Sequence, residues 1–251
     1  MKIINDGLPE PIFNFLKTNF YDLKFKPDTL SATTLLKPVQ EILLTQRHYD
    51  EIEIPASERL WSVWGSAIHE ILDKAYNGHD VEKEERLSTT IGNWVISGKF
   101  DLIVDGILHD YKSTSAWTIV YGSRTEEWIK QLSIYRYLYL QQKNKLLSPE
   151  AKIITMLRDW ASRDVGKKGY PATNILEIPI KLLGIDEIKQ FIKNKLKLID
   201  KFINVPDSEL PACSDADRWW NEKQKVYIKC ERKYCVCHGF CSQYQKVKGG
   251  G

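Results

Sequence analysis

The chain has 251 residues, of which 43% are hydrophobic and 11% aromatic, and its formal net charge is +3 at pH 7. This length can form one large hydrophobic core with smaller appendages, and so small a net charge does not by itself indicate a partner. No run of about 18 apolar residues is present, and MKIINDGLPEPIF lacks a basic segment followed by an apolar block, so we expect no membrane span, no secretory signal, and a cytoplasmic location (host cytoplasm if the protein is viral).

Helical patterns occupy the first part of the chain. SATTLLKPVQEILLTQRH (31–48) is predicted to be helical, with Ser31 as its N-cap and Pro38 as a point of interruption. ERLWSVWGSAIHEILDKAY (58–76) is predicted to form the next helix. Its apolar stripe consists of Ile68, Ile71, Leu72 and Ala75.

A strand region opens with GNWVISGKF and continues to Ser113. RTEEWIKQLSIYRYLYLQQ (124–142) is predicted to be a helix, because its acidic residues come early, where the helix dipole favours them. AKIITMLRDW (151–160) and ILEIPI (175–180) are predicted strands. The order from residue 58 is thus helix, three strands, helix, strand, which indicates an α/β fold.

The last long pattern, GIDEIKQFIKNKLKLIDKF (184–202), predicts an amphipathic helix. Its inward face should consist of Ile185, Ile188, Ile192, Leu196 and Ile199. We find no internal repeat and no low-complexity linker, so one compact domain is expected overall.

The stretch GKFDLIVDGILHDYKST (98–114) is predicted to be a hairpin. Asp105-Gly106 favours a two-residue turn, because both positions tolerate a positive φ angle. Counting outward from this turn places Asp101 opposite Asp110. Directly opposed residues have Cβ atoms about 5 Å apart, where two like charges are unfavourable.

Lys112 lies two residues beyond Asp110, so its side chain is expected on the same face of the hairpin. A divalent cation between the two carboxylates would remove their repulsion, and Lys112 could then contact a metal-bound water or stabilise a developing negative charge. The alternative is that Asp101 and Lys112 are solvent-facing strand residues with ordinary partners and that Asp110 ends a strand.

Three other polar residues are candidates for the same site. His69 lies beside the apolar stripe of the helix over 58–76, where a lone histidine is more often packed or exposed than a ligand. Gln131 and Tyr135 are spaced i, i+4 and therefore share a helix face, a pattern that is also usually structural.

The order and spacing of these residues resemble the PD-(D/E)XK nuclease superfamily. The chain has a histidine on a helix, then Asp101, then D-Y-K nine to eleven residues later, then Q-x3-Y on the next helix. More narrowly it resembles the RecB-type branch, which includes lambda-like and CRISPR-adaptation exonucleases and many phage nucleases. The resemblance covers about residues 31–160, and SATTLLKP and WGSAIHEIL are similar to the entry helices of phage-encoded members.

This resemblance implies a restriction-endonuclease-like core, made of a helix, a three-stranded antiparallel hairpin sheet, a helix and a strand. The implied organisation is an N-terminal helical entry segment (1–57), the nuclease core (58–182), and an extension with a helix and a cysteine-rich part (183–251).

The resemblance also implies a role for each residue of the hairpin. Asp101 and Asp110 match the carboxylates that hold a catalytic Mg²⁺ or Mn²⁺, and the backbone carbonyl of Tyr111 matches a third ligand. Lys112 matches the lysine that orients or activates the attacking water. His69 matches a branch-specific histidine that adds a metal ligand.

Further residues are implied to contact or guide DNA. Gln131 and Tyr135 match a motif that contacts the DNA backbone near the scissile phosphate, and Glu85 matches an acidic position of some members. Basic residues gather in three stretches that suit a polyanion if they are more than solvated faces: 162–170, 189–202 and 223–234. The aromatic residues that could stack unpaired bases, if they are not core residues, are Trp117, Trp128 and Trp160.

All five cysteines lie in the last forty residues: Cys213, Cys230, Cys235, Cys237 and Cys241. An odd number with tight local spacing, in a chain with no export signal, argues against a disulfide framework and favours a metal or a cluster. The spacing C-x4-C-x-C-x3-C is not a standard zinc-finger pattern.

Some relatives carry a four-cysteine iron–sulfur cluster with one cysteine in the entry helix, but SATTLLKPVQEILL has none. KCERKYCVCHGFCSQY resembles the C-terminal part of that pattern. Three states therefore stay open: zinc on the last four cysteines, an unusual cluster that recruits Cys213, or free thiols. His238 is a substitute ligand.

The function that these observations predict is a metal-dependent DNA exonuclease acting in recombination, replication or DNA processing. The alternatives are a structure-specific endonuclease on branched or RNA substrates and a catalytically silent DNA-binding scaffold. The expected partners are single- or double-stranded DNA, recombination or replication proteins, and further copies of the chain if it forms an oligomer.

Overall fold

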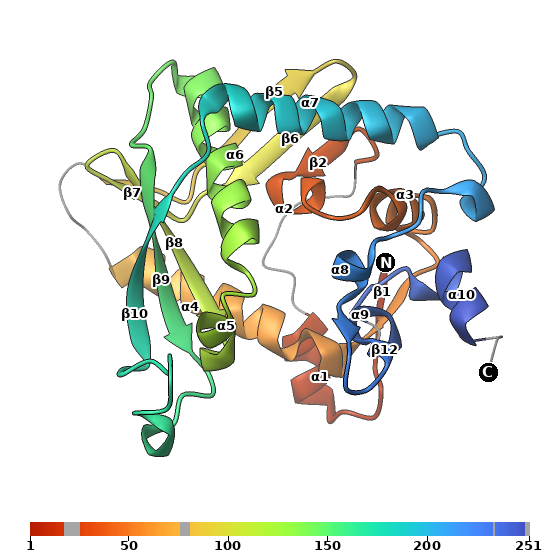
Figure 1. Cartoon of the computed structure of the whole chain (residues 1–251), viewed down its shortest axis with the longest axis horizontal. Coiled ribbons are helices and arrows are strands. Elements are labelled where there is room, and N and C mark those ends of the chain that lie inside the picture. The colour runs from red at the N-terminus through yellow and green to blue at the C-terminus, as the bar shows by residue number, and fades with distance from the viewer. Residues whose placement is uncertain (18–25, 76–80, 233, 249–251) are drawn as a thin grey trace. The chain divides into compact units, whose positions relative to one another are not determined.

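The computed structural model describes residues 1–17, 26–75, 81–232 and 234–248. The chain forms two compact units, each built from segments that are not contiguous in sequence (Figure 1). The sheet unit comprises Asp28–Leu36 and Trp64–Phe191. The cysteine unit comprises Met1–Pro27, Lys37–Val63 and Ile192–Gly251. The domain boundaries expected after residues 57 and 182 stay a prediction.

The main sheet of the sheet unit has five strands in the order β10-β9-β8-β7-β4. Strands β8 and β9 are parallel, and the other neighbours are antiparallel. The strands are β4 (Val81–Lys83), β7 (Leu102–Val104), β8 (Ile107–Thr114), β9 (Glu150–Leu157) and β10 (Ile175–Lys181). The strand predicted over 175–180 is confirmed, and the strand predicted over 151–160 is confirmed up to Leu157, where β9 ends.

A second sheet of the same unit has the order β2-β6-β5 and consists of β2 (Thr29–Ser31), β5 (Arg86–Ile91) and β6 (Trp94–Lys99). The expected three-stranded antiparallel sheet is therefore wrong in its partners, because β6 pairs with β5 and β2 rather than with β7. The reason is the two-residue turn at Gly92 and Asn93, where Gly92 has a φ of 61° and folds β6 back onto β5.

The helices agree with most of the sequence predictions. The region 31–48 forms α2 (Ala32–Leu35) and α3 (Val39–Arg47), interrupted at Pro38 as predicted. Ser31 caps α2, since its hydroxyl accepts a 3.0 Å hydrogen bond from the backbone N–H of Thr34. The other helices of this part of the chain are α4 (Leu60–Ala75), α5 (Ala116–Tyr121), α6 (Thr125–Lys143) and α7 (Ile185–Phe202), with short 3₁₀ turns η1 (Ala56–Arg59) and η2 (Ser162–Asp164).

Burial confirms one amphipathic prediction and corrects another. On α7 the predicted inward residues are buried except for Ile185, which is half-buried. On α4, however, Ile71 is 66% exposed and Ala75 is exposed, so the predicted apolar stripe is not a core face. No helix within the described part of the chain is long and apolar enough to cross a membrane.

The cysteine unit has little sheet. Strand β1 (Lys2–Ile4) pairs in parallel with β3 (Glu53–Pro55). Its remaining elements, beyond α3 and the second part of α7, are α1 (Glu10–Lys17), η3 (Asp207–Glu209), α8 (Asp215–Arg218), β11 (Trp220–Asn221), β12 (Val226–Tyr227), α9 (Ile228–Glu231), η4 (His238–Phe240) and α10 (Ser242–Lys248).

A histidine clamp joins three segments of the cysteine unit. The His48 ring lies 2.8 Å from Glu51 Oε1 through Nδ1 and 2.7 Å from Asp207 Oδ2 through Nε2. It also stacks on Phe240, with ring centroids 4.0 Å apart. Arg47 binds the other oxygen of Asp207 at 2.5 Å.

This clamp makes the stability of the cysteine unit pH-dependent. Burial favours the neutral imidazole, but the hydrogen bonds to Asp207 and Glu51 outweigh it and raise the pKa of His48 above its usual value. The stabilisation is complete below the unfolded pKa of about 6.5 and is lost as the pH rises through the raised folded pKa. We therefore expect the difference in unfolding free energy between wild type and His48→Gln to shrink from about pH 6 to about pH 9 in urea titrations. A difference that is constant over this range would contradict the clamp.

Candidate active site

The predicted hairpin forms the centre of the site. Both turn residues have positive φ angles, 51° at Asp105 and 75° at Gly106, as a type I′ turn requires. Strand β7 begins at Leu102, so Asp101 lies one residue outside the ladder. Its carboxylate is nevertheless held against β8, because Oδ2 accepts a 2.8 Å hydrogen bond from the backbone N–H of Tyr111.

Asp110 is the buried carboxylate of the site. It is 2% exposed, and its Oδ2 lies 2.5 Å from Lys112 Nζ. This contact is an ion pair without normal hydrogen-bond geometry, so Oδ2 lacks a proper donor although it is fully buried. Burial, with a contribution from Asp101, raises the pKa of Asp110 to about 6. Burial also disfavours charge on Lys112, but Asp110 and Asp101 outweigh it and raise the pKa of this lysine.

His69 on α4 completes a cluster of four titratable residues. Its Nδ1 lies 3.2 Å from Asp101 Oδ1, and its ring meets that of Tyr111 edge-on at a centroid distance of 6.1 Å. Burial lowers the pKa of His69, but the hydrogen bond to Asp101 and the charges of Asp101 and Asp110 raise it more. The structure therefore brings His69, Asp101, Asp110 and Lys112 together.

Two acidic residues near this cluster were not predicted. Glu84 lines the same pocket as His69 and pairs with Lys99, whereas the expected Glu85 pairs with Lys143 at 2.7 Å. Glu84 has a φ of 38°, an unusual value that nothing in the sequence V-E-K-E-E-R around it indicates.

The second acidic residue that was not predicted is Glu127, in the first turn of α6. Its charge contributes to the raised pKa of Lys112. It lies one helical turn before Gln131, so the spacing that singled out Gln131 and Tyr135 could have identified it.

Gln131 and Tyr135 are buried on α6, each 6% exposed. The Gln131 amide donates a 2.8 Å hydrogen bond to the hydroxyl of Tyr135. Gly98 of β6 makes room for this pair, because a Cβ atom there would lie 2.5 Å from Tyr135 Cε1. In this structure the two side chains thus bond to each other and pack between α6 and β6.

The three candidate stacking residues differ in exposure. Trp128 is buried, and Trp160 is half-buried with its indole N–H donating to Pro171 O at 2.9 Å. Trp117 is 37% exposed. Only Trp117 of these three therefore presents a large part of its ring to solvent.

Several basic residues of the three stretches have structural partners. Lys167 pairs with Asp164 at 2.5 Å, Lys195 donates to Lys37 O at 2.9 Å, and Lys229 pairs with Glu41 at 2.6 Å. Lys233 of the third stretch lies outside the described residues. The stretches are therefore not uniform cationic surfaces.

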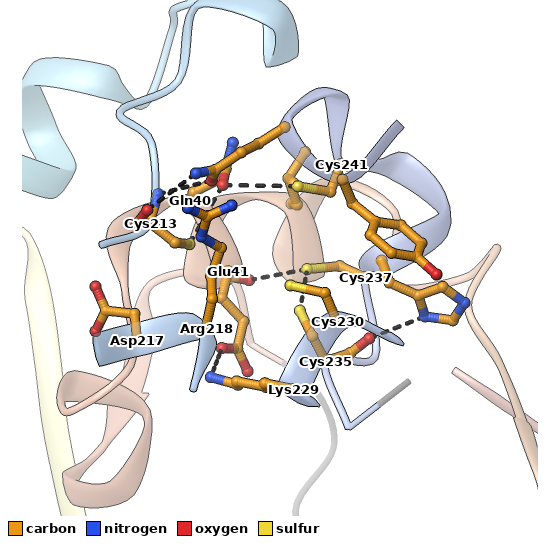
Figure 2. A pocket seen from close by; sticks show the side chains of 14 residues that line it. Gln40, Glu41, Cys213, Asp217, Arg218, Lys229, Cys230, Cys235, Cys237 and Cys241 are labelled. Atoms are coloured by element: carbon orange, nitrogen blue, oxygen red, sulfur yellow. Dashed lines mark hydrogen bonds and ion pairs between the residues drawn. The ribbon is translucent and has the colours of Figure 1, made fainter. Parts of the chain in front are cut away.

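The cysteines form a second cluster, within the cysteine unit. All five line one pocket, and Figure 2 shows the sulfur atoms of Cys230, Cys235 and Cys237 close to one another. The Cys235 and Cys237 sulfurs are 3.4 Å apart. Cys213 and Cys241 approach the buried Gln40, whose Oε1 accepts from their thiols at 3.3 and 3.7 Å (Figure 2). His238 also lines the pocket, with Nδ1 2.9 Å from Cys235 O.

The structure describes all five cysteines, and none of them forms a disulfide bond. Burial raises the pKa of Cys213 to about 12 and that of Cys230 to about 11. The pKa of Cys235 is lowered by the hydrogen bond from Cys237, whose own pKa is raised by the same bond and by burial. Within the described residues, no three histidine, cysteine, aspartate or glutamate side chains are already arranged around a metal position, either here or at the hairpin.

No protein-family model and no curated protein matches the chain. Among solved structures it is similar to one described as "Crystal structure of SSO0001", with a TM-score of 0.56 and 17% identity over 93% of this chain and 94% of that one. A phage related exonuclease from Haemophilus somnus 129PT has a TM-score of 0.45 and 13% identity, with 73% of this chain and 94% of that chain covered. An alkaline exonuclease from Laribacter hongkongensis has a TM-score of 0.41 and 16% identity, with 70% of this chain and 90% of that chain covered. The likeness to the first of these structures shows that the two chains share a fold, and the description of that structure names no activity.

Proposed function

We propose that the chain is a metal-dependent DNA exonuclease whose site consists of His69, Asp101, Asp110 and Lys112. The observation that carries the proposal is the buried carboxylate of Asp110, whose pKa is raised to about 6 by burial and by the neighbouring Asp101 although Lys112 lies 2.5 Å away. One lysine does not compensate two carboxylates, and uncompensated buried charge is costly, so the pair favours a bound cation.

The donor set fits Mg²⁺ or Mn²⁺. Asp101 and Asp110, with the backbone carbonyl of Tyr111, supply the oxygen ligands that these ions prefer, and His69 supplies a nitrogen that suits Mn²⁺. The metal would acidify the attacking water and neutralise charge on the phosphate. Lys112 would release Asp110 to the cation, hold the attacking water, and stabilise the negative charge that develops on the phosphate oxygens.

Gln131 and Tyr135 are proposed to contact the DNA backbone near the scissile phosphate. Because they now bond to each other, this role requires the amide of Gln131 to exchange the Tyr135 hydroxyl for a phosphate oxygen. The protein would act on this DNA in the cytoplasm of a cell, or of the host if the protein is viral, during recombination, replication or DNA processing. Its partners would be proteins of those pathways or further copies of the chain.

The alternatives are an endonuclease on branched or RNA substrates and a DNA-binding scaffold without catalysis. Linear end-labelled DNA, covalently closed circular DNA and the same sequences as RNA distinguish them when each is incubated with Mg²⁺, with Mn²⁺ and with chelator. An exonuclease shortens only the linear DNA and only with metal. Cleavage of circles would establish the endonuclease, and unchanged binding with no cleavage of any substrate would establish the scaffold.

We also propose that the last four cysteines, Cys230, Cys235, Cys237 and Cys241, hold zinc or an iron–sulfur cluster. The position of all four cysteines around one pocket supports it, since thiolates are the ligands that both groups use. Cys213 and His238 line the same pocket and are the available substitutes.

Metal analysis of protein purified without oxygen tests this second site. Wild type should carry about one zinc or one cluster per chain, and Cys237→Ser should lose most of it because Cys237 is a buried proposed ligand. Absorption in the visible range separates the cluster from zinc. Wild-type protein with neither metal would show that the cysteines are free thiols.

A further inference from the structure

The short helix α5 directly follows the strand that carries Asp110 and Lys112. One side of it is fixed in a small core, where Ala116 is fully buried with Leu157 and Tyr170. Its first turn is held by Asp159, which accepts hydrogen bonds from the Ser115 hydroxyl at 2.6 Å and the Ala116 N–H at 2.7 Å. The helix is therefore a rigid element rather than a loose connection.

The other side of α5 presents two aromatic rings to solvent. Trp117 and Tyr121 are spaced i, i+4, and their rings stack with centroids 6.0 Å apart and an angle of 24°. Trp117 is 37% exposed and Tyr121 is 73% exposed. Tyr170 supports Trp117 from the side, edge-on at 5.5 Å. The result is a preformed aromatic surface with a free face, of the kind on which planar groups stack.

Cationic side chains border this surface. Arg158 follows β9, and its backbone N–H donates to Thr114 O at 2.9 Å, so it lies at the end of the strand that leads into α5. Burial lowers the pKa of Arg158, the charge of Asp159 opposes this effect, and the neighbouring guanidinium of Arg124 adds to it. In the loop before Tyr170, Arg163 has an 87% exposed side chain and Lys168 is also exposed.

The basic residues of this region outnumber its acidic ones. The basic residues are Arg124, Arg158, Arg163, Lys167 and Lys168, and the acidic residues are Glu127, Asp159 and Asp164. Asp164 pairs with Lys167, Glu127 lies 3.6 Å from Arg124, and Asp159 holds the start of α5. The net charge of these residues is therefore positive. An aromatic surface with bordering arginines is complementary to a chain that alternates planar bases with phosphates.

We propose that Trp117 and Tyr121 form a stacking platform for the unpaired bases of a single-stranded DNA end, with Arg124 and Arg158 binding its phosphates. The proposal rests on the proposed nuclease function and specifies that the site accepts single-stranded DNA. Lys112 and Trp117 are five residues apart, which is about 17 Å at most along the chain. A few nucleotides therefore suffice to connect a base on the platform with a phosphate at the hairpin.

The test is binding, measured by fluorescence anisotropy in the presence of chelator so that no cleavage is needed. The probes are a labelled oligothymidine and a blunt duplex of equal length. Trp117→Ala should weaken the affinity for oligothymidine about tenfold and change duplex affinity little, because base–aromatic stacking contributes only when bases are unpaired. Trp117→Phe should retain most of the affinity, which separates loss of stacking from loss of folding.

Trp220→Ala is the matched control, because Trp220 is similarly exposed, at 41%, but belongs to the cysteine unit. It should bind both probes like wild type. Unchanged oligothymidine affinity in a folded Trp117→Ala variant, or an equal loss for both probes, would overturn the platform. Wild type that binds oligothymidine through Trp117 but cuts no DNA with metal would instead overturn the nuclease function and leave the platform intact.

Discussion

Lys112→Ala is expected to lower the single-turnover rate constant of DNA hydrolysis by about 10²- to 10⁴-fold, with little change in DNA affinity. Lys112 lies 2.5 Å from the buried Asp110, and the charges of Asp110 and Asp101 raise its pKa. Removing it takes away the group that holds the attacking water and stabilises charge on the phosphate, and both effects operate mainly in the transition state.

Lys152→Ala is the matched control for this experiment. Lys152 lies on the adjacent strand β9, is partly exposed and pairs with Glu177 at 2.8 Å, away from the hairpin carboxylates. Its substitution should leave the rate constant within about twofold of wild type, since exposed ion pairs contribute little. If both variants cut DNA at the wild-type rate, Lys112 has no part in the reaction.

Lys229→Met is expected to have the largest effect on stability, lowering the free energy of unfolding by about 3 kcal/mol. Lys229 and Glu41 form a buried ion pair at 2.6 Å, with side chains 15% and 4% exposed. Burial alone would raise the pKa of Glu41, but Lys37 and Lys229 outweigh it and lower that pKa. Without Lys229, the carboxylate of Glu41 stays charged and buried but has lost this partner. The resulting loss of unfolding free energy is larger than the net stabilisation that the ion pair provided.

Lys37→Met is the control, because it removes a cation from the same carboxylate. Lys37 lies 2.9 Å from Glu41, but its side chain is 41% exposed, so water can replace it. Its substitution should cost less than about 1 kcal/mol in urea unfolding followed by tryptophan fluorescence. Equal losses in the two variants would mean that burial does not determine the strength of these ion pairs.

The sequence predicted those parts of the site that depend only on residues close to one another along the chain. The Asp105-Gly106 turn and the strand alternation after it are short-range features, and they correctly brought Asp101, Asp110 and Lys112 together. The break between α2 and α3 at Pro38 is also a local feature, because proline lacks a backbone N–H and has a fixed φ angle.

The partners of each element could not be predicted in this way. Strand β6 has the composition of a core strand. The turn at Gly92 and Asn93 pairs one of its edges with β5, but only the tertiary fold decides that the other edge pairs with β2 instead of β7. Glu84 and Glu85 are adjacent and chemically alike, and the positive φ at Glu84 alone turns it toward the pocket of His69.

The exposed Ile71 shows the limit of periodicity as a signal. A helical stripe identifies which residues share a face, but it does not identify whether that face meets a core. The same limit applies to Cys213, which sequence spacing leaves far from the other cysteines and which the fold brings to Gln40 beside Cys241.

The measurement that most directly tests whether the hairpin is a metal-dependent site is calorimetric titration of Mn²⁺ into wild type and Asp110→Asn, without DNA. Wild type should bind Mn²⁺ at a site that Asp110→Asn lacks, because the substitution removes the buried anionic ligand and leaves the shape of the side chain nearly unchanged. Equal binding by the two proteins, or none by wild type, would contradict a cation between Asp101 and Asp110.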